Sequence, residues 1–239
     1  YIELQDAYKS IYESLIHAGA HHDTKVHVVR VDAEEIEDKG AREVIGLVDG
    51  ILVPGGFGDR GTEGKILAAK YAREKRIPYF GICLGMQIAT IEFARNVCGL
   101  KGANSTEFVK ATPHPVICLQ EEQKGVEDMG ATMRLGASQA ILFAGTRAAQ
   151  LYGNAERIQE RHRHRYEFNS DYQERLQEKG LVISSVSADE GLVEIVELPE
   201  HPFYIGAQFH PEFQSKPNHP HPLFSGFVAA ALEHSQREG

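Results

Sequence analysis

The sequence predicts an α/β fold with a mixed, mainly parallel central sheet flanked by helices. Two observations lead to this prediction. Short runs rich in valine and isoleucine alternate with amphipathic helical patterns in the first hundred residues, and the later part of the chain is richer in strands. No segment of 20–50 residues repeats, and no Pro/Ser/Gly-rich linker divides the chain. We therefore expect residues 1–239 to form one domain.

Three short apolar runs in the first half predict buried strands, because glycine, proline or charged residues bound each of them. They are Val26–Val31, Gly50–Pro54 and Ile77–Ile82. Apolar residues three and four apart predict helices before and between these runs. The predicted helices are Ala7–Ala18, Glu63–Lys75 and Leu84–Val97. Strands that alternate with helices pair in parallel, with the helices on the faces of the sheet.

The second half predicts further strands, several with turn signals between them, and a closing helix. The strands are Pro115–Leu119, Thr132–Leu135, Ala140–Phe143, Val182–Val186, Leu192–Glu197 and Phe203–Phe209, and the helix is Pro222–His234. The acidic stretch Gln120–Met129 predicts an exposed loop.

Composition narrows the functional classes. Apolar residues make up 42% and charged residues 25% of the 239, as in globular proteins. The net charge of -9 argues against nucleic acid as the main partner, and no apolar run approaches the roughly 20 residues of a membrane helix. A small-molecule substrate fits this composition better. Three cysteines, an odd number, imply a free thiol and a reducing compartment, so we expect a cytoplasmic location.

A glycine-rich segment follows the second predicted strand, where Gly56–Gly61 matches G-x-G-x-x-G. At dinucleotide sites, this pattern is accompanied by an acidic residue at the end of the next strand, which holds the ribose. Here the next strand ends at Cys83 with no acidic residue. A tight turn that needs positive φ, or a functional loop, is therefore favoured over a nucleotide site.

Cys83 lies in a predicted strand-to-helix turn, Gly81–Gly85, that is the cysteine counterpart of the G-x-S-x-G nucleophile elbow. The glycines let strand and helix approach, and the thiol lies at a helix N-terminus, where partial positive charge favours the thiolate. A buried core cysteine is the alternative interpretation, and it is the one we favour for Cys98 and Cys118. The elbow favours a nucleophilic role for Cys83.

The strongest candidate for a general base is His210, in Gln-Phe-His-Pro-Glu at the end of an apolar strand. If the chain stays extended through Pro211, His210 and Glu212 project to one side, and the carboxylate can orient the imidazole. A surface His-Pro turn is the alternative, because several other His-Pro pairs occur in the chain.

Three segments carry a family resemblance: Pro54–Gly58, Gly81–Gln87 and His210–Glu212. In their order and wide separation they resemble the signatures of the class I, or triad, glutamine amidotransferases. Within that class, further segments resemble the glutaminase domain of the CTP synthase family. These are Asp6–Ser10, Asn104–Phe108, Gly130–Gly136 and Arg161–Glu167.

The resemblance implies that the Cys83 thiolate attacks the side-chain amide of L-glutamine, that ammonia leaves, and that water releases glutamate from a thioester. His210 would be the base, and Glu212 would orient it. The oxyanion hole would be formed by backbone N–H groups, those of Gly55, Gly56 and Leu84.

Free glutamine also carries an α-ammonium and an α-carboxylate, which a selective pocket pairs with opposite charges. By resemblance, Glu107 would bind the ammonium and Arg165 the carboxylate. The remaining predicted substrate-binding residues are Gly56, Phe57, Leu84, Gln87 and Tyr166. A metal site at His162 and His164 is disfavoured because no convincing third ligand lies nearby, so we expect no metal.

The resemblance further implies that the chain is part of a larger two-domain enzyme, expected to be a homo-oligomer. Its synthetase domain would bind ATP and UTP, with ATP and Mg²⁺ serving that domain and no cofactor serving the glutaminase. The chain has no Gly-x4-Gly-Lys-Ser/Thr loop. Two alternatives stay open: the glutaminase of another biosynthetic synthetase, of the GMP or anthranilate synthase type, and a catalytically silent module that keeps the fold.

Overall fold

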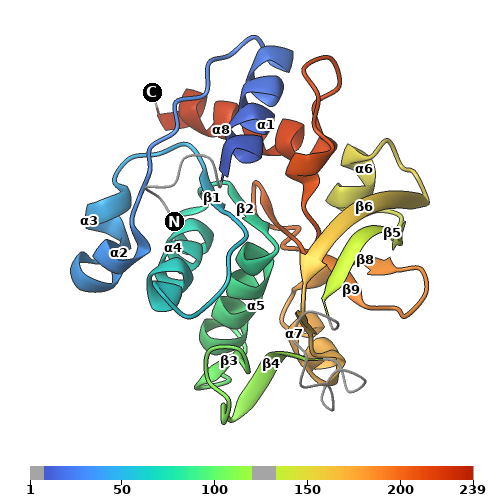
Figure 1. Cartoon of the computed structure of the whole chain (residues 1–239). Helices are drawn as coiled ribbons and strands as arrows, with labels where there is room; N and C mark the ends of the chain where they lie inside the picture. The colour runs from blue at the N-terminus through green and yellow to red at the C-terminus, as the bar shows by residue number, and fades with distance from the viewer. Residues whose placement is uncertain (1–7, 120–132, 239) are drawn as a thin grey trace.

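A seven-stranded mixed sheet forms the centre of the computed structural model, which describes residues 8–119 and 133–238 (Figure 1). The strand order is β1-β2-β10-β9-β8-β5-β6. The strands are β1 (Ile51–Val53), β2 (Tyr79–Ile82), β5 (Arg134–Leu142), β6 (Arg157–His164), β8 (Val182–Ser187), β9 (Val193–Glu197) and β10 (Tyr204–Ala207). A second sheet has the order β3-β4-β7, made of β3 (Ala103–Ser105), β4 (His114–Leu119) and β7 (Tyr166–Phe168).

Helices cover both faces of the large sheet. The α-helices are α1 (Lys9–His21), α2 (Ala33–Lys39), α3 (Ala41–Ile45), α4 (Thr62–Lys75), α5 (Leu84–Asn96), α6 (Arg147–Leu151), α7 (Gln173–Gln177) and α8 (Pro222–Glu238). Two short 3₁₀ segments are η3 (Ser170–Tyr172) and η4 (Pro211–Phe213). None of the described helices has the length and apolarity needed to cross a bilayer.

Alternation along β2 divides the core into two layers. Tyr79 packs in one apolar cluster with α4 and α5, whereas the next residue, Phe80, packs in the other with α1 and α8. Figure 1 shows α1 and α8 together on one side of the sheet, and α4 with α5 on the other. The predicted α/β fold with a mixed sheet between helices is therefore confirmed.

The expected predominance of parallel pairing is wrong. Among the described residues, β1–β2 and β2–β10 are parallel, whereas β10–β9, β9–β8, β8–β5 and β5–β6 are antiparallel. The reason lies in the connections. A parallel neighbour requires a crossover of about a dozen residues or more, and the chain returns from β8 to β9 through residues 188–192 alone.

The strand predicted at Val26–Val31 is also wrong, because these residues form no strand and pair with no described segment. Val28 and Val29 are 46% and 68% exposed. A run of β-branched residues predicts burial, but a strand also requires a neighbour that supplies backbone hydrogen bonds.

Two strands predicted separately, from Thr132 and from Ala140, are one strand in the described residues, β5. Gly136 within it has a φ of +100° but still lies opposite His162, because β5 pairs with β6 from Arg134 to Ile141. The pairing with β6 thus keeps β5 continuous, although Gly136 has a positive φ that is typical of turns. The loop predicted at Gln120–Met129 and the residue Thr132 lie outside the described residues.

Candidate active site

Cys83 lies at the turn between β2 and α5, as the elbow motif predicts. Its φ is +52° and its ψ is -101°, a conformation that residues with a side chain rarely adopt. The Cys83 N–H donates to the carbonyl of Ala207 at 2.7 Å, so the strand pairing of β10 holds the turn in place. The thiol is thereby presented at the N-terminus of a thirteen-residue helix.

Two glycines make this turn possible. A Cβ on Gly81 would lie 2.5 Å from the Gly85 carbonyl group, and one on Gly85 would lie 2.1 Å from the carbonyl oxygen of Val53. Either contact is far shorter than real Cβ atoms show. Helix α5 can therefore pack on β1 and β2 only because both positions lack a side chain.

His210 and Glu212 meet beside the nucleophile. His210 Nδ1 lies 2.7 Å from Glu212 Oε1, and both side chains are buried. The chain does not stay extended through Pro211 as expected, because residues Pro211–Phe213 form η4. The two side chains nevertheless meet across this 3₁₀ turn. Phe213 stacks on the His210 ring with centroids 5.3 Å apart.

His210 is set up to carry a positive charge. Burial opposes that charge, but the interactions with Cys83 and Glu212 outweigh it and raise the pKa of His210 to about 10. Its Nε2 makes no hydrogen bond of ordinary length within the described residues. The nitrogen that Glu212 does not engage is thus available for proton transfer with Cys83 or a bound substrate.

A small pocket opens beside the thiol, and it contains most of the predicted substrate-binding residues. It is lined by Gly56, Phe57, Cys83, Gln87, Glu107, His164, Arg165 and Tyr166. Its volume is about 20 Å³, room for about one water molecule. Entry of a ligand as large as an amino-acid side chain therefore requires part of the wall to move. Gly55 and Leu84 lie outside this lining, in a larger groove of about 730 Å³ that follows β1.

The pocket is lined by one acidic and one basic residue, Glu107 and Arg165. Burial raises the pKa of Glu107, while the Gly58 N–H, which donates to Glu107 Oε1 at 3.1 Å, and the charge of Arg165 act against that rise. Burial also raises the pKa of Tyr166, a residue affected by the charges of both Glu107 and Arg165. One carboxylate and one guanidinium therefore line the same small pocket.

The glycine loop forms the outer wall of the pocket. Gly58 and Gly61 have φ angles of +82° and +64°, as a tight turn requires. Phe57 is 43% exposed, and the Arg163 guanidinium lies 5.8 Å from the centre of its ring.

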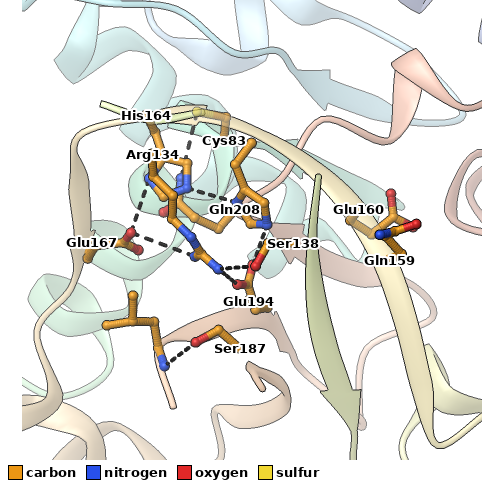
Figure 2. Close-up of polar contacts among 12 residues, drawn as sticks. Cys83, Arg134, Ser138, Gln159, Glu160, His164, Glu167, Ser187, Glu194 and Gln208 are labelled. Atoms are coloured by element: carbon orange, nitrogen blue, oxygen red, sulfur yellow. Dashed lines mark hydrogen bonds and ion pairs between the residues drawn. The ribbon is translucent and has the colours of Figure 1, made fainter. Parts of the chain in front are cut away.

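His162 and His164 are buried in a polar cluster with Arg134, Glu167 and Glu194. Figure 2 shows His164 with the arginine and the two carboxyl groups. Burial, with the nearby charge of Arg134, lowers the pKa of His162 to about 3, and burial lowers that of His164 well below its usual value. Burial raises the pKa of Glu194 to about 7 against the opposing effect of Arg134. Within the described part of the chain, no group of three or more His, Cys, Asp or Glu side chains is arranged to hold a metal ion.

Sequence reasoning missed three residues of this site. His164 lines the pocket, Phe213 stacks on His210, and the side-chain amide of Gln208 reaches Cys83, with 3.7 Å between Nε2 and Sγ. Gln208 and Phe213 flank the His-Pro-Glu triplet, so the motif itself contained a signal for both. The alternation of arginine and histidine from Arg161 to Arg165 was the signal for His164, because alternate residues of a strand face opposite sides.

The comparisons with known proteins agree with this geometry. Residues 3–230 match the family model described as glutamine amidotransferase class-I. The chain is 59% identical over 232 residues to the CTP synthase of Caldanaerobacter subterraneus subsp. tengcongensis and 55% identical over 238 residues to that of Staphylococcus aureus. These matches cover 97% and 100% of this chain but 43% and 44% of the relatives, so the chain spans less than half of their length.

Solved structures show the same relationship. The glutaminase domain of Trypanosoma brucei CTP synthase with bound acivicin matches with a TM-score of 0.90 and 41% identity, covering 98% of this chain and 91% of that one. A Thermoplasma acidophilum protein described as a GMP synthase subunit matches with a TM-score of 0.55 and 18% identity over 90% of this chain and 84% of that one, which shows a shared fold. The chain belongs to the class-I glutamine amidotransferase family and, within it, to the glutaminase domains of CTP synthases.

Proposed function

We propose that Cys83, His210 and Glu212 carry out the glutaminase reaction of this domain, which releases glutamate and ammonia from L-glutamine. The observation that carries the proposal is that a cysteine with positive φ, at the start of α5, interacts with His210, whose Nδ1 lies 2.7 Å from Glu212 Oε1. This arrangement supports the assignment of Cys83 as nucleophile, His210 as base and Glu212 as orienting group.

In the proposed first step, the Cys83 thiolate adds to the side-chain carbonyl carbon of glutamine, and His210 holds the thiol proton. The developing oxyanion receives hydrogen bonds from backbone N–H groups of Leu84 and of the Gly55–Gly56 turn. Leu84 is the first residue of α5, where N–H groups have no partner within the helix.

As the tetrahedral intermediate collapses, the C–N bond breaks and His210 passes its proton to the leaving nitrogen, so ammonia departs and a Cys83 thioester remains. Water then attacks the thioester while His210 accepts one of its protons. Glutamate leaves, and the thiolate and imidazolium are restored.

Substrate selection is assigned to the charged walls of the pocket. Glu107 pairs with the α-ammonium and Arg165 with the α-carboxylate, at opposite ends of one small molecule. The other contacts are assigned to Gly56, Phe57, Leu84, Gln87 and Tyr166. Of these, all but Leu84 line the small pocket, which supports this assignment.

We further propose that residues 1–239 form one domain of a two-domain, homo-oligomeric, cytoplasmic enzyme whose synthetase domain uses ATP, Mg²⁺ and this ammonia to convert UTP to CTP. The proposal is supported by the two CTP synthases, because the segment of each that matches this chain makes up less than half of its length. The expected oligomer, the cytoplasmic location and the absence of a cofactor in the glutaminase domain stay predictions.

The decisive experiment measures glutamate release from L-glutamine by the purified chain. The unaltered chain must release glutamate, and Cys83→Ala must abolish release while keeping the unfolding temperature. A silent module would show no difference between the two. A full-length CTP synthase, assayed beside the chain with and without ATP, UTP and GTP, then tests coupling. If the chain alone already matches the stimulated full-length enzyme, the proposed coupling is wrong.

A further inference from the structure

We propose that Gln208 is a positioning residue for the nucleophile: its side-chain amide donates a hydrogen bond to the Cys83 sulfur, and Gln87 sets the direction of that amide. The inference rests on the proposed role of Cys83 as the nucleophile. It gives the sulfur a donor in addition to His210.

The contact lies in the interior of the protein. Gln208 Nε2 is 3.7 Å from Cys83 Sγ, and Gln208 is fully buried, with Cys83 only 4% exposed (Figure 2). A buried amide must find partners inside the protein, because leaving it unpaired destabilises the fold. The partners of the Gln208 amide are Cys83 Sγ and the side chain of Gln87.

The direction of the amide follows from the groups around it. Gln87 Nε2 donates to the backbone carbonyl of Tyr166 at 3.1 Å and to Gln208 Oε1 at 3.3 Å. A backbone carbonyl can only accept, so the Gln87 amide must present its nitrogen to this side. Gln208 then presents its oxygen to Gln87, and its nitrogen faces the sulfur.

The backbone holds both residues in register. β2 and β10 are parallel neighbours, with Ile82 opposite Ala207, so Cys83 and Gln208 follow side by side at the ends of the two strands. The Gln208 N–H donates to the carbonyl of Glu194 at 2.8 Å, and that of Cys83 donates to Ala207 at 2.7 Å. The position of Gln208 is thus set by the sheet rather than by a loop.

The chemical consequence concerns the charged state of the sulfur. A thiolate is an acceptor without a donor, and an N–H donor aimed at it favours the thiolate over the thiol. With His210 and Gln208 both beside the sulfur, the anion has two neighbouring donors in a largely buried position. The amide also restricts the rotation of the side chain, which keeps the sulfur directed at the pocket.

The test follows the alkylation of Cys83 by iodoacetamide across the pH range, with peptide mass spectrometry to separate it from Cys98 and Cys118. This readout needs no glutamine turnover. In Gln208→Met, which keeps the volume but lacks the donor, we expect the midpoint of the rate profile to move up by about one to two pH units, with alkylation at neutral pH about 10- to 100-fold slower. Glutamine turnover falls mainly in kcat, with KM little changed.

Gln208→Glu is the second variant, because its shape is nearly that of glutamine while its ionised carboxylate repels the thiolate. We expect a larger upward shift of the midpoint than in Gln208→Met. The matched control is Gln214→Met, since Gln214 contacts Gln159 and Glu160 rather than Cys83. A residue with a purely structural role would lower the stability of the protein without moving the midpoint.

Midpoints equal to that of the unaltered chain in both Gln208 variants would overturn the proposal. If neither variant folds, the unaltered chain decides: the side-chain amide signals of Gln208 in NMR must titrate with the alkylation midpoint, and those of Gln214 must not. A Gln208 signal that does not respond to that titration also overturns it. A midpoint shift in a chain without glutaminase activity would support the contact and reject the proposed function instead.

Discussion

Gly55 lies against the imidazole ring of His210, and a Cβ on Gly55 would come 2.8 Å from Cε1 of that ring. The same Cβ would lie 3.6 Å from the Cβ of Cys83, so the glycine closes the space beside both residues. The loop that follows β1 is therefore shaped around the base and the nucleophile together. This close approach leads to the first prediction.

Gly55→Ala should displace the His210 ring, because a contact under 3.0 Å forces something to move. Misplacing a reacting group by about 1 Å costs about 100-fold in rate, so we expect kcat for glutamate release to fall by about that factor. Gly99→Ala is the control, since its Cβ would meet no atom within 4 Å and the residue does not line the pocket. Equal kcat values for the two variants would contradict the prediction.

Arg165→Ala should raise the KM for glutamine by about 10- to 100-fold, because the α-carboxylate loses a charge-assisted partner in both ground and transition state. Arg165→Lys should recover only part of the loss, since an ammonium does not reproduce the planar fork of a guanidinium. Steady-state kinetics measure both effects. Unchanged kinetics in Arg165→Ala would remove this residue from the site.

Glu212→Gln should shift the alkaline limb of the pH profile. The charge of Glu212 contributes to the raised pKa of His210, about 10, so the neutral amide lowers that pKa. The imidazolium that protonates ammonia is then lost at a lower pH, and kcat declines earlier on the alkaline side. The measurement is kcat against pH for both proteins. Coincident alkaline limbs would show that the carboxylate charge does not act on His210.

His201 should make the fold sensitive to acid. Burial, with smaller effects of the Arg76 and Arg147 charges, lowers the pKa of His201 from 6.5 to about 4, and the ring accepts from Phe203 N–H at 3.2 Å. Between these two pH values the unfolded chain binds a proton that the folded chain does not, so the free energy of unfolding falls as pH falls from 6.5 to 4. Above pH 6.5 this contribution is fully present.

Urea unfolding at pH 7 and pH 5 checks this expectation, with His201→Gln as the comparison. The variant is less stable at both pH values, but the difference in unfolding free energy between them should be smaller than in the unaltered chain. An equal pH dependence would assign the acid sensitivity to other groups.

Much of the site follows from local sequence. Gly81 and Gly85 around Cys83 predict the elbow, because only residues without side chains allow a helix to pack so closely on the strand that feeds it. The period of apolar residues likewise predicts α4 and α5 to within a residue or so at each end. The His-Pro-Glu triplet brings its two side chains together even though the turn is 3₁₀ rather than extended. These features depend on neighbours within a few positions.

The rest depended on residues far apart in the chain. Val26–Val31 has the composition of a strand, but no described segment pairs with it. The antiparallel part of the sheet depends on the pairing of β5 with β6 and of β8 with β9, which local sequence does not determine. The amide of Gln208 reaches Cys83, 125 positions away, through the register of β10 on β2. Periodicity and turn chemistry act over a few residues, whereas strand pairing and burial are set by whichever segments supply hydrogen bonds and apolar surface in the folded chain.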